Sequence, residues 1–321
     1  MAIENKETIK KAAIVALGVA MIASLAILTS ARVQSRFVEL SSGGSLVFID
    51  KYVDESLRNE FAAGIDYYTE GFMHAAGLLG EAPERGPVAF FAADRHYGVL
   101  SANDPLVKRR LKGRPSSDFV LFRSIGASFY ANELVARSVA SQDGAYVFVN
   151  IDDGWRASLL HAYAHSIAAA NVPAALSPAF VLDQDFDPEF KFAYRFVDET
   201  FALLASDILE LAESTGSVER AWSSFSAFTA RRYADPESDV AAREAEIIMA
   251  TYDLPQKSAE FYAACNGFAS WLLDSHGRDA LSAAARTFFS GRYDSLDDPF
   301  TAFGGLAEAL RGWKGDATIP R

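Results

Sequence analysis

The chain has 321 residues, of which 50% are hydrophobic and 12% aromatic, a composition too apolar for an intrinsically disordered protein. Thirty lysines and arginines stand against 42 aspartates and glutamates, and the net charge of −12 argues against a nucleic-acid partner, which needs basic residues to neutralise its phosphates. The single cysteine, Cys265, excludes an internal disulfide and a multi-cysteine metal site.

Much of the apolar excess lies in one segment near the N-terminus. Residues 12–29 form a run of 18 residues without a charge, preceded by three lysines. As a helix this run is about 27 Å long, close to the hydrocarbon thickness of a bilayer. We therefore expect one transmembrane anchor over 12–30, with residues 1–11 in the cytoplasm because the lysines precede the span. Two alternatives stay open: a signal peptide cleaved near 29–31, and a buried core helix.

Strand patterns dominate the region that follows. Short apolar runs bounded by glycine, proline, serine or aspartate predict strands. These predicted strands cover residues 46–49, 87–91, 119–122 and 146–151. Between the first two, helical spacing predicts a helix over 53–79 that ends at Gly80.

A basic segment interrupts the strands. Residues 101–118 are polar and predict a surface loop or a short helix, and within them 108–114 holds five lysines and arginines and no acidic residue. In so acidic a protein this run is expected to be a solvated surface, or else a contact for phospholipid or for an acidic partner.

From residue 155 the pattern becomes helical and stays so almost to the end. The main predicted breaks are 171–189, which holds three prolines, and the surroundings of Pro236, Pro255 and Gly291. Strands first and helices afterwards predict an α+β fold, with a small N-terminal sheet and a mainly helical C-terminal half. We expect residues 31–44 to be a linker and residues 45–315 to form one domain.

The chemistry concentrates at His161 and His165, which lie four residues apart in the helical sequence SLLHAYAHSIAAA. Residues with this spacing share a helix face, so both imidazoles can reach one metal ion. The HExxH helix of zinc proteases uses the same spacing for two ligands and its glutamate as general base. The spacing alone does not distinguish a metal site from a packed histidine pair.

A third ligand is available thirty-four residues later, where a second helix carries the sequence FVDETFA with Glu199. A catalytic zinc ion needs a third protein ligand and one open position for water. The stretch resembles the segment, commonly NEGxA, that carries the third ligand in gluzincin metallopeptidases, although Thr200 replaces its glycine. Without that resemblance, Glu199 is an ordinary carboxylate on an acidic helix.

The sequence from 261 to 315 adds a further similarity. It contains an aromatic pair, a small residue three positions on, an apolar helix and a glycine between two helices. A short acidic loop and an amphipathic helix with a terminal tryptophan complete the pattern. This order resembles the C-terminal half of the peptidase MA-like family of gluzincins. With the strands at 87–91 and 146–151 in the family's order, the resemblance covers roughly residues 45–315.

The resemblance implies a zincin-like fold and one zinc ion held by His161, His165 and Glu199. It implies that the hydroxyl of Tyr262 stabilises the oxyanion formed during peptide hydrolysis; otherwise Tyr262 is a core tyrosine. It also implies that the strand 146–151 is an open sheet edge, along which a substrate backbone pairs. The lone cysteine is expected to be a small buried residue.

One position departs from the family in a way that bears directly on activity. Ala162 stands where HExxH has its glutamate, the group that takes a proton from zinc-bound water and passes it to the leaving amine. Metal binding should survive this change, whereas turnover should fall by orders of magnitude. Two explanations stay open: an engineered inactive form, and a natural pseudopeptidase that keeps the metal for structure or binding.

These observations predict a single-pass membrane protein whose main domain is extracytoplasmic, or periplasmic in a Gram-negative cell. Its expected activity is that of a zinc metallopeptidase acting on a protein or peptide substrate, inactive or nearly so because of Ala162. The alternative function is a metal-containing binding or scaffold protein at the membrane. The sequence leaves open the oligomeric state and the choice between endo- and exopeptidase action.

Overall fold

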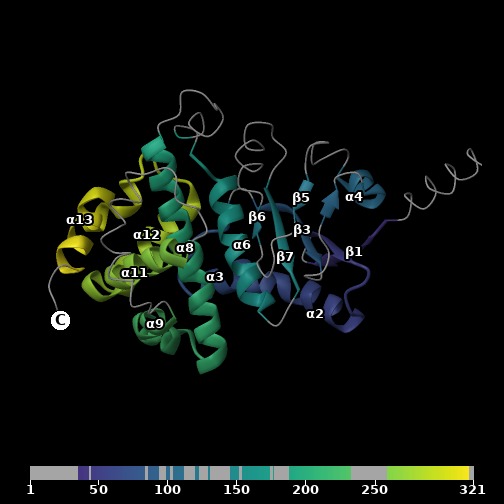
Figure 1. Cartoon of the computed structure of the whole chain (residues 1–321), viewed down its shortest axis with the longest axis horizontal. Helices are drawn as coiled ribbons and strands as arrows, with labels where there is room; N and C mark the ends of the chain where they lie inside the picture. Colours follow the sequence, from purple (N-terminus) through teal and green to yellow (C-terminus); the bar gives the residue numbers. More distant parts are fainter. Residues whose placement is uncertain are drawn as a thin grey trace, which may run out of the picture.

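A mixed five-stranded sheet joined to a group of helices makes up the part of the chain that the computed structural model describes (Figure 1). The described residues are 35–42, 45–83, 86–93, 99–101, 104–111, 120–122, 129–130, 145–151, 154–173, 176, 188–232 and 259–317. In spatial order, the strands of the sheet are β1 (Phe37–Ser42), β2 (Ser45–Asp50), β3 (Pro87–Ala93), β7 (Ala145–Asn150) and β6 (Phe129–Tyr130). A separate antiparallel pair consists of β4 (Val99–Ser101) and β5 (Val120–Phe122).

The first strand corrects a predicted boundary. β1 pairs antiparallel with β2 along its whole length, from Phe37 opposite Asp50 to Ser42 opposite Ser45. The expected linker over 31–44 is therefore wrong over residues 37–42, because these residues form an edge strand of the domain. Phe37 is buried and its ring packs edge-on against Phe91 of β3, so apolar packing holds the added strand.

The substrate-pairing edge predicted at 146–151 is also corrected. The strand exists as β7, but β3 pairs with it in parallel on one side and β6 pairs with it antiparallel on the other. Since Phe129 and Tyr130 lie opposite Phe148 and Val147, the backbone of β7 is already paired there. The outer strand on this side of the sheet is β6, a short strand that the sequence did not reveal.

Helices account for most of the remaining described residues. In the first half they are α2 (Glu55–Asp66), a π-helical turn (Tyr67–Gly71), α3 (Phe72–Ala75) and α4 (Pro105–Arg110). In the second half they are α6 (Trp155–Ala170), α8 (Pro188–Thr215), α9 (Val218–Arg232), α11 (Ala259–His276), α12 (Arg278–Ser290), a 3₁₀ helix (Asp298–Phe303) and α13 (Leu306–Ala317). The predicted break at Gly291 is the left-handed cap of α12, whereas Pro236 and Pro255 lie outside the described residues.

The predicted helix over 53–79 is shorter and less regular than expected. Thr69 leaves the helical region inside the π-helical turn, and α3 ends at Ala75 rather than near Gly80. Gly77 takes a φ of +76°, which residues with a Cβ rarely adopt, and so lets the chain turn out of the helix. The indole of Trp222 on α9 donates a hydrogen bond to the carbonyl of Ala76, 3.1 Å away, and ties this turn to the helical half.

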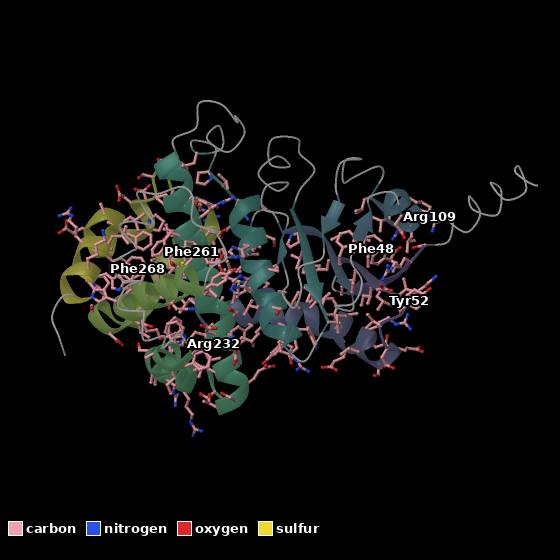
Figure 2. All side chains as sticks on the ribbon, viewed as in Figure 1. Phe48, Tyr52, Arg109, Arg232, Phe261 and Phe268 are labelled. Carbon is pink, nitrogen blue, oxygen red and sulfur yellow. The ribbon has the colours of Figure 1, made fainter. Side chains whose placement is uncertain are left out.

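The sheet and the C-terminal helices share one core, with α6 and α8 between them (Figure 1). α6 packs against β7 on one side and against α8 on the other, which explains why it is apolar almost all round. Figure 2 labels Phe261 and Phe268, which belong to this core among the helices, and Phe48 in the sheet, which is also buried but lies outside this cluster. Two neighbouring helices that are both held in the core provide a rigid base for side chains on their facing surfaces.

The predicted membrane anchor falls on residues that the structure does not describe. Residues 1–34 lie before the first described residue. Among the described residues, which begin at Ser35, no helix is long and apolar enough to cross a membrane.

α8 carries a buried carboxylate that should make stability depend on pH. Asp207 lies eight residues beyond Glu199, and its Oδ1 is 3.5 Å from Nη1 of Arg232 on α9. Burial raises the pKa of Asp207 from 3.8 to about 7, although Arg232 acts in the opposite direction. Between these two values the folded chain keeps a proton that the unfolded chain has lost. The contribution of Asp207 to stability therefore declines as the pH rises through this window.

We expect Asp207→Asn to remove this decline. Three pKa units correspond to about 4 kcal/mol, so the free energy of unfolding of the wild type should fall by on the order of that amount relative to the variant between pH ~4 and pH ~7. Urea unfolding of both proteins across this range measures the difference, with Asp279→Asn on α12 as an exposed control. Parallel stability curves for the wild type and Asp207→Asn would contradict the assignment.

Candidate metal centre

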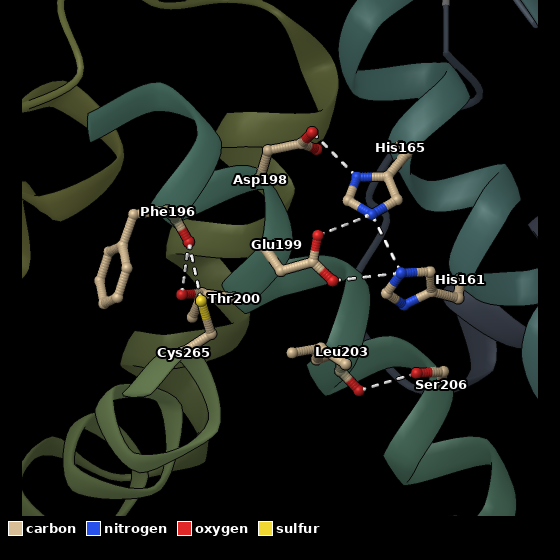
Figure 3. Close-up of polar contacts among 9 residues, drawn as sticks. All are labelled: His161, His165, Phe196, Asp198, Glu199, Thr200, Leu203, Ser206 and Cys265. Atoms are coloured by element: carbon tan, nitrogen blue, oxygen red, sulfur yellow. Dashed lines mark hydrogen bonds and ion pairs between the residues drawn. The ribbon is translucent and has the colours of Figure 1, made fainter. Parts of the chain in front are cut away.

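His161, His165 and Glu199 meet where α6 packs against α8 (Figure 3). The Nε2 atoms of the two histidines are 3.1 Å apart. Oε1 of Glu199 lies 3.2 Å from Nε2 of His161, and Oε2 lies 3.3 Å from Nε2 of His165. The structure thus brings together all three residues that the sequence singled out as ligands.

These separations fit a single small cation of the zinc type. Zn–N and Zn–O bonds near 2.1 Å in a tetrahedron place neighbouring ligand atoms about 3.3–3.4 Å apart. The 3.1 Å between the two Nε2 atoms is close to that edge length. A different oxygen of Glu199 contacts each of them, at 3.2 and 3.3 Å, and ligand atoms of the three residues all lie within 4.8 Å of one another. Two imidazole nitrogens and a carboxylate also form a ligand set that zinc uses in catalytic sites. When protons take the place of a metal, the same atoms form a hydrogen-bonded group of a histidine pair and a carboxylate.

Asp198 is a functional candidate that sequence reasoning missed. Its Oδ2 lies 2.9 Å from Nδ1 of His165, and both side chains are buried, with exposed fractions of 2% and 1%. A carboxylate at Nδ1 fixes the imidazole tautomer that leaves Nε2 free to bind a metal, and it makes that nitrogen more basic. The available signal was an acid directly before the proposed ligand Glu199, but only the packing of α8 on α6 shows that both acids face one histidine.

The electrostatics of the group favour a cation. Burial alone would lower the pKa of His165, but the negative charges of Asp198 and Glu199 raise it to about 10. Burial alone would raise the pKa of Glu199, but His165 and His161 hold it well below its usual range. In the metal-free chain a proton therefore supplies positive charge at His165, and zinc binding would have to displace it.

One side of the cluster of His161, His165 and Glu199 is exposed to solvent, and the other side is buried. The side chains of His161 and Glu199 are 21% and 12% exposed, whereas those of His165 and Asp198 are almost fully covered. A ligand from solvent can therefore approach along the side of His161, while Asp198 and the core support the opposite side. Catalytic zinc sites have this asymmetry, since they keep one position open.

Tyr262 lies on α11, partly buried beside Phe261, at a distance where it senses Glu199. Burial first, and then the negative charge of Glu199, raise the pKa of Tyr262 to about 12. The phenol is therefore protonated at neutral pH and can donate a hydrogen bond. The charge of Glu199 acts on this residue, and its role as an oxyanion donor stays a prediction.

The side chain of Thr200, which stands where the resembled segment has glycine, points away from the metal ligands. Its hydroxyl donates to the carbonyl of Phe196, 2.6 Å away, one turn back on α8. The buried Sγ of Cys265 on α11 approaches the same carbonyl at 3.8 Å (Figure 3). Threonine in place of glycine is thus accommodated at the contact between α8 and α11, and the lone cysteine is a small buried residue, as expected.

Ala162 is fully buried and belongs to the hydrophobic core. A methyl group can neither accept nor donate a proton, so the position supplies no general base. The two acidic residues that shortly precede this helix in the sequence, Asp152 and Asp153, lie outside the described residues.

We expect loss of Asp198 to weaken metal binding without removing a ligand. Asp198→Ala should lower zinc affinity about 10–100-fold, the effect typical of residues that orient a ligating histidine. Asp198→Asn should have a smaller effect, because its amide oxygen can still accept from Nδ1 of His165. Competition with a chromophoric chelator measures the affinity, and Asp207→Asn, a buried carboxylate on the same helix, is the control. Equal affinity in wild type and Asp198→Ala would contradict the orienting role.

Comparisons with protein-family models, with curated proteins and with solved structures found no match for this chain.

Proposed function

We propose that the chain is a membrane-anchored, extracytoplasmic metallopeptidase of the gluzincin type whose site lacks its general base at position 162. The observation that carries the proposal is the convergence of His161, His165 and Glu199, whose ligand atoms lie within 4.8 Å of one another, with Asp198 behind His165. The N-terminal apolar segment supports the anchor, and its flanking lysines support a cytoplasmic N-terminus. The proposed substrate is a protein or peptide.

In this proposal each residue of the site has a separate role in zinc-dependent peptide hydrolysis. His161, His165 and Glu199 would hold the zinc ion, and Asp198 would keep Nε2 of His165 directed at it. A bound zinc ion supplies a Lewis acid that polarises a carbonyl and lowers the pKa of a water molecule. The hydroxyl of Tyr262 would donate a hydrogen bond where negative charge develops on the substrate oxygen.

The side chain of Ala162 cannot move the proton that this chemistry requires. In the family that the chain resembles, a glutamate here accepts a proton from the attacking water and delivers it to the leaving amine. Positioned acid–base groups contribute about 10²–10⁴-fold to rate, so the chain as it stands should be almost inactive. An engineered Glu→Ala change and a natural loss both account for the residue.

A second candidate function is favoured by the burial of Ala162. A side chain with no exposed surface inside the core suits a small apolar residue. This packing fits a natural pseudopeptidase, a metal-containing protein that binds or tethers a partner at the membrane.

Ala162→Glu tests the peptidase proposal directly. The zinc-loaded variant is incubated with a proteome-derived peptide pool, with and without a chelator, and the products are identified by mass spectrometry. Cleavage that the chelator abolishes supports the proposal. A folded, zinc-loaded variant that cleaves nothing would leave the binding protein as the better explanation.

A further inference from the structure

Part of the basic run lies next to the point where the described domain begins. Oγ of Ser35 donates to Oδ1 of Asp104 at 2.8 Å, and the backbone amide of Arg36 donates to Oδ2 of the same residue at 2.9 Å. Asp104 is also the N-cap of α4, where it accepts hydrogen bonds from the amides of Leu106 and Val107. The beginning of the domain is thus tied directly to α4, the short helix that holds the first half of the basic run.

Other basic groups surround the same point. Arg36 forms an ion pair of 2.7 Å with Asp50, and Arg110 of α4 pairs with Glu39 of β1. Nζ of Lys51 reaches the carbonyl of Ser35 at 3.4 Å.

The positive charge at this end is only partly compensated. Within the part of the chain that the structure describes, no acidic side chain forms an ion pair with Lys51 or with the exposed Arg109. Tyr52, whose ring lies 5.3 Å from Nζ of Lys51, is 62% exposed. Figure 2 shows Arg109 and Tyr52 at the same end of the molecule, far from the helical half. Exposed tyrosine together with lysine and arginine is typical of protein surfaces at a membrane interface.

The predicted anchor would place this end of the domain close to a bilayer. Only residues 30–34 separate the apolar run, which ends at residue 29, from Ser35. Five residues span at most about 18 Å, and the headgroup layer that they must cross is roughly 5–8 Å thick. The basic groups around Ser35 would then lie in contact with the headgroups, or within about one Debye length of them.

We propose that the surface formed by Arg36, Lys51, Tyr52, Arg109 and Arg110, the basic face, docks on anionic phospholipid of the membrane that holds the anchor. A protein with a net charge of −12 is repelled by an anionic bilayer unless a locally basic surface approaches first. Docking there would fix the orientation of the domain, with the metal centre between α6 and α8 held away from the bilayer. The docking rests on the anchor of the proposed function and is independent of the metal site.

The test uses the full chain, reconstituted through its N-terminal segment into nanodiscs. One set of discs contains phosphatidylcholine alone and the other also contains phosphatidylglycerol. Tyr52→Trp provides an exposed reporter, and headgroup spin-labelled lipid quenches it when the basic face is docked. We expect stronger quenching in the anionic discs and a loss of the difference at high salt.

Arg109→Glu should lower the ratio of docked to undocked chains at least fivefold, since one basic residue near an anionic surface contributes about that factor. Arg220→Glu, an exposed arginine on α9, changes the net charge equally and should leave the quenching unchanged. Equal quenching in the two kinds of disc, or an equal effect of the two variants, would overturn the proposal, the latter pointing to net charge alone.

Failure of the anchor is distinguishable from failure of the docking or of the enzyme. If alkaline carbonate extracts the chain from membranes, no anchor holds the basic face at a bilayer and the docking proposal is overturned. Zinc affinity and the activity of Ala162→Glu are measured separately and would not be affected by that result.

Discussion

Ala162→Glu should increase zinc-dependent peptide hydrolysis by about 10²–10⁴-fold over the chain as it stands, because it restores a group that moves a proton between the attacking water and the leaving amine. The three proposed ligands His161, His165 and Glu199 already converge, and Tyr262 stays protonated at neutral pH. Initial rates on a cleaved peptide, measured before and after chelation, give the size of the effect.

The burial of Ala162 sets a condition on this result. A carboxylate placed in the core without a partner loses several kcal/mol of hydration, and a nearby metal ion offsets part of that loss. We therefore expect Ala162→Glu to be less stable than the wild type without zinc and to recover stability when zinc is added.

Ala162→Gln is the matched control for the gain of activity. Glutamine has nearly the same volume as glutamate and cannot accept the proton, so this variant should bind zinc and remain inactive. Equal activities for Ala162→Glu and Ala162→Gln would show that hydrolysis does not depend on a base at this position. A large loss of stability in both variants, without activity, would indicate a core repacked around alanine and favour the natural pseudopeptidase.

His165→Ala should produce the largest loss of stability. His165 is the buried cation beside the carboxylates of Asp198 and Glu199, which lie 2.9 and 3.3 Å from its ring nitrogens. Removing one partner of a buried ionic pair costs about 3–5 kcal/mol, because the remaining charges lose both hydration and their counter-ion. Urea unfolding of the metal-free proteins should show a loss of this order.

Zinc should stabilise the wild type and not the His165→Ala variant. At a free zinc concentration 100 times the dissociation constant, binding to the folded state alone adds about 2.7 kcal/mol. His276→Ala, which removes an exposed histidine at the end of α11, should keep the full response to zinc. A wild type that contains no stoichiometric zinc by elemental analysis, and whose midpoint does not move on zinc addition, would rule out the metal assignment.

Most strands and helices could be predicted because their patterns are local. The runs at 46–49 and 87–91 are apolar throughout, as expected for strands whose two faces are both buried. Both lie inside the sheet, as β2 and β3. β1 and β6 were missed for a different reason. An edge strand is specified by its pairing partner, and the two-residue β6 is too short to show any period.

The sequence by itself determined that His161 and His165 could reach one metal ion. Two histidines four residues apart on a helix must share a face, whatever surrounds that helix. It also determined the absence of a base at 162, since alanine has no proton to exchange. These conclusions depend only on side-chain chemistry and on the period of one helix.

Only the tertiary structure decided how those residues meet and what supports them. The packing of α8 on α6 brings Glu199 within 3.3 Å of His165 and turns the adjacent Asp198 toward the same ring. The sheet order shows that β7 is paired on both sides, and the core shows that Ala162 is enclosed. Such facts depend on contacts between segments distant in the chain, which no local pattern encodes.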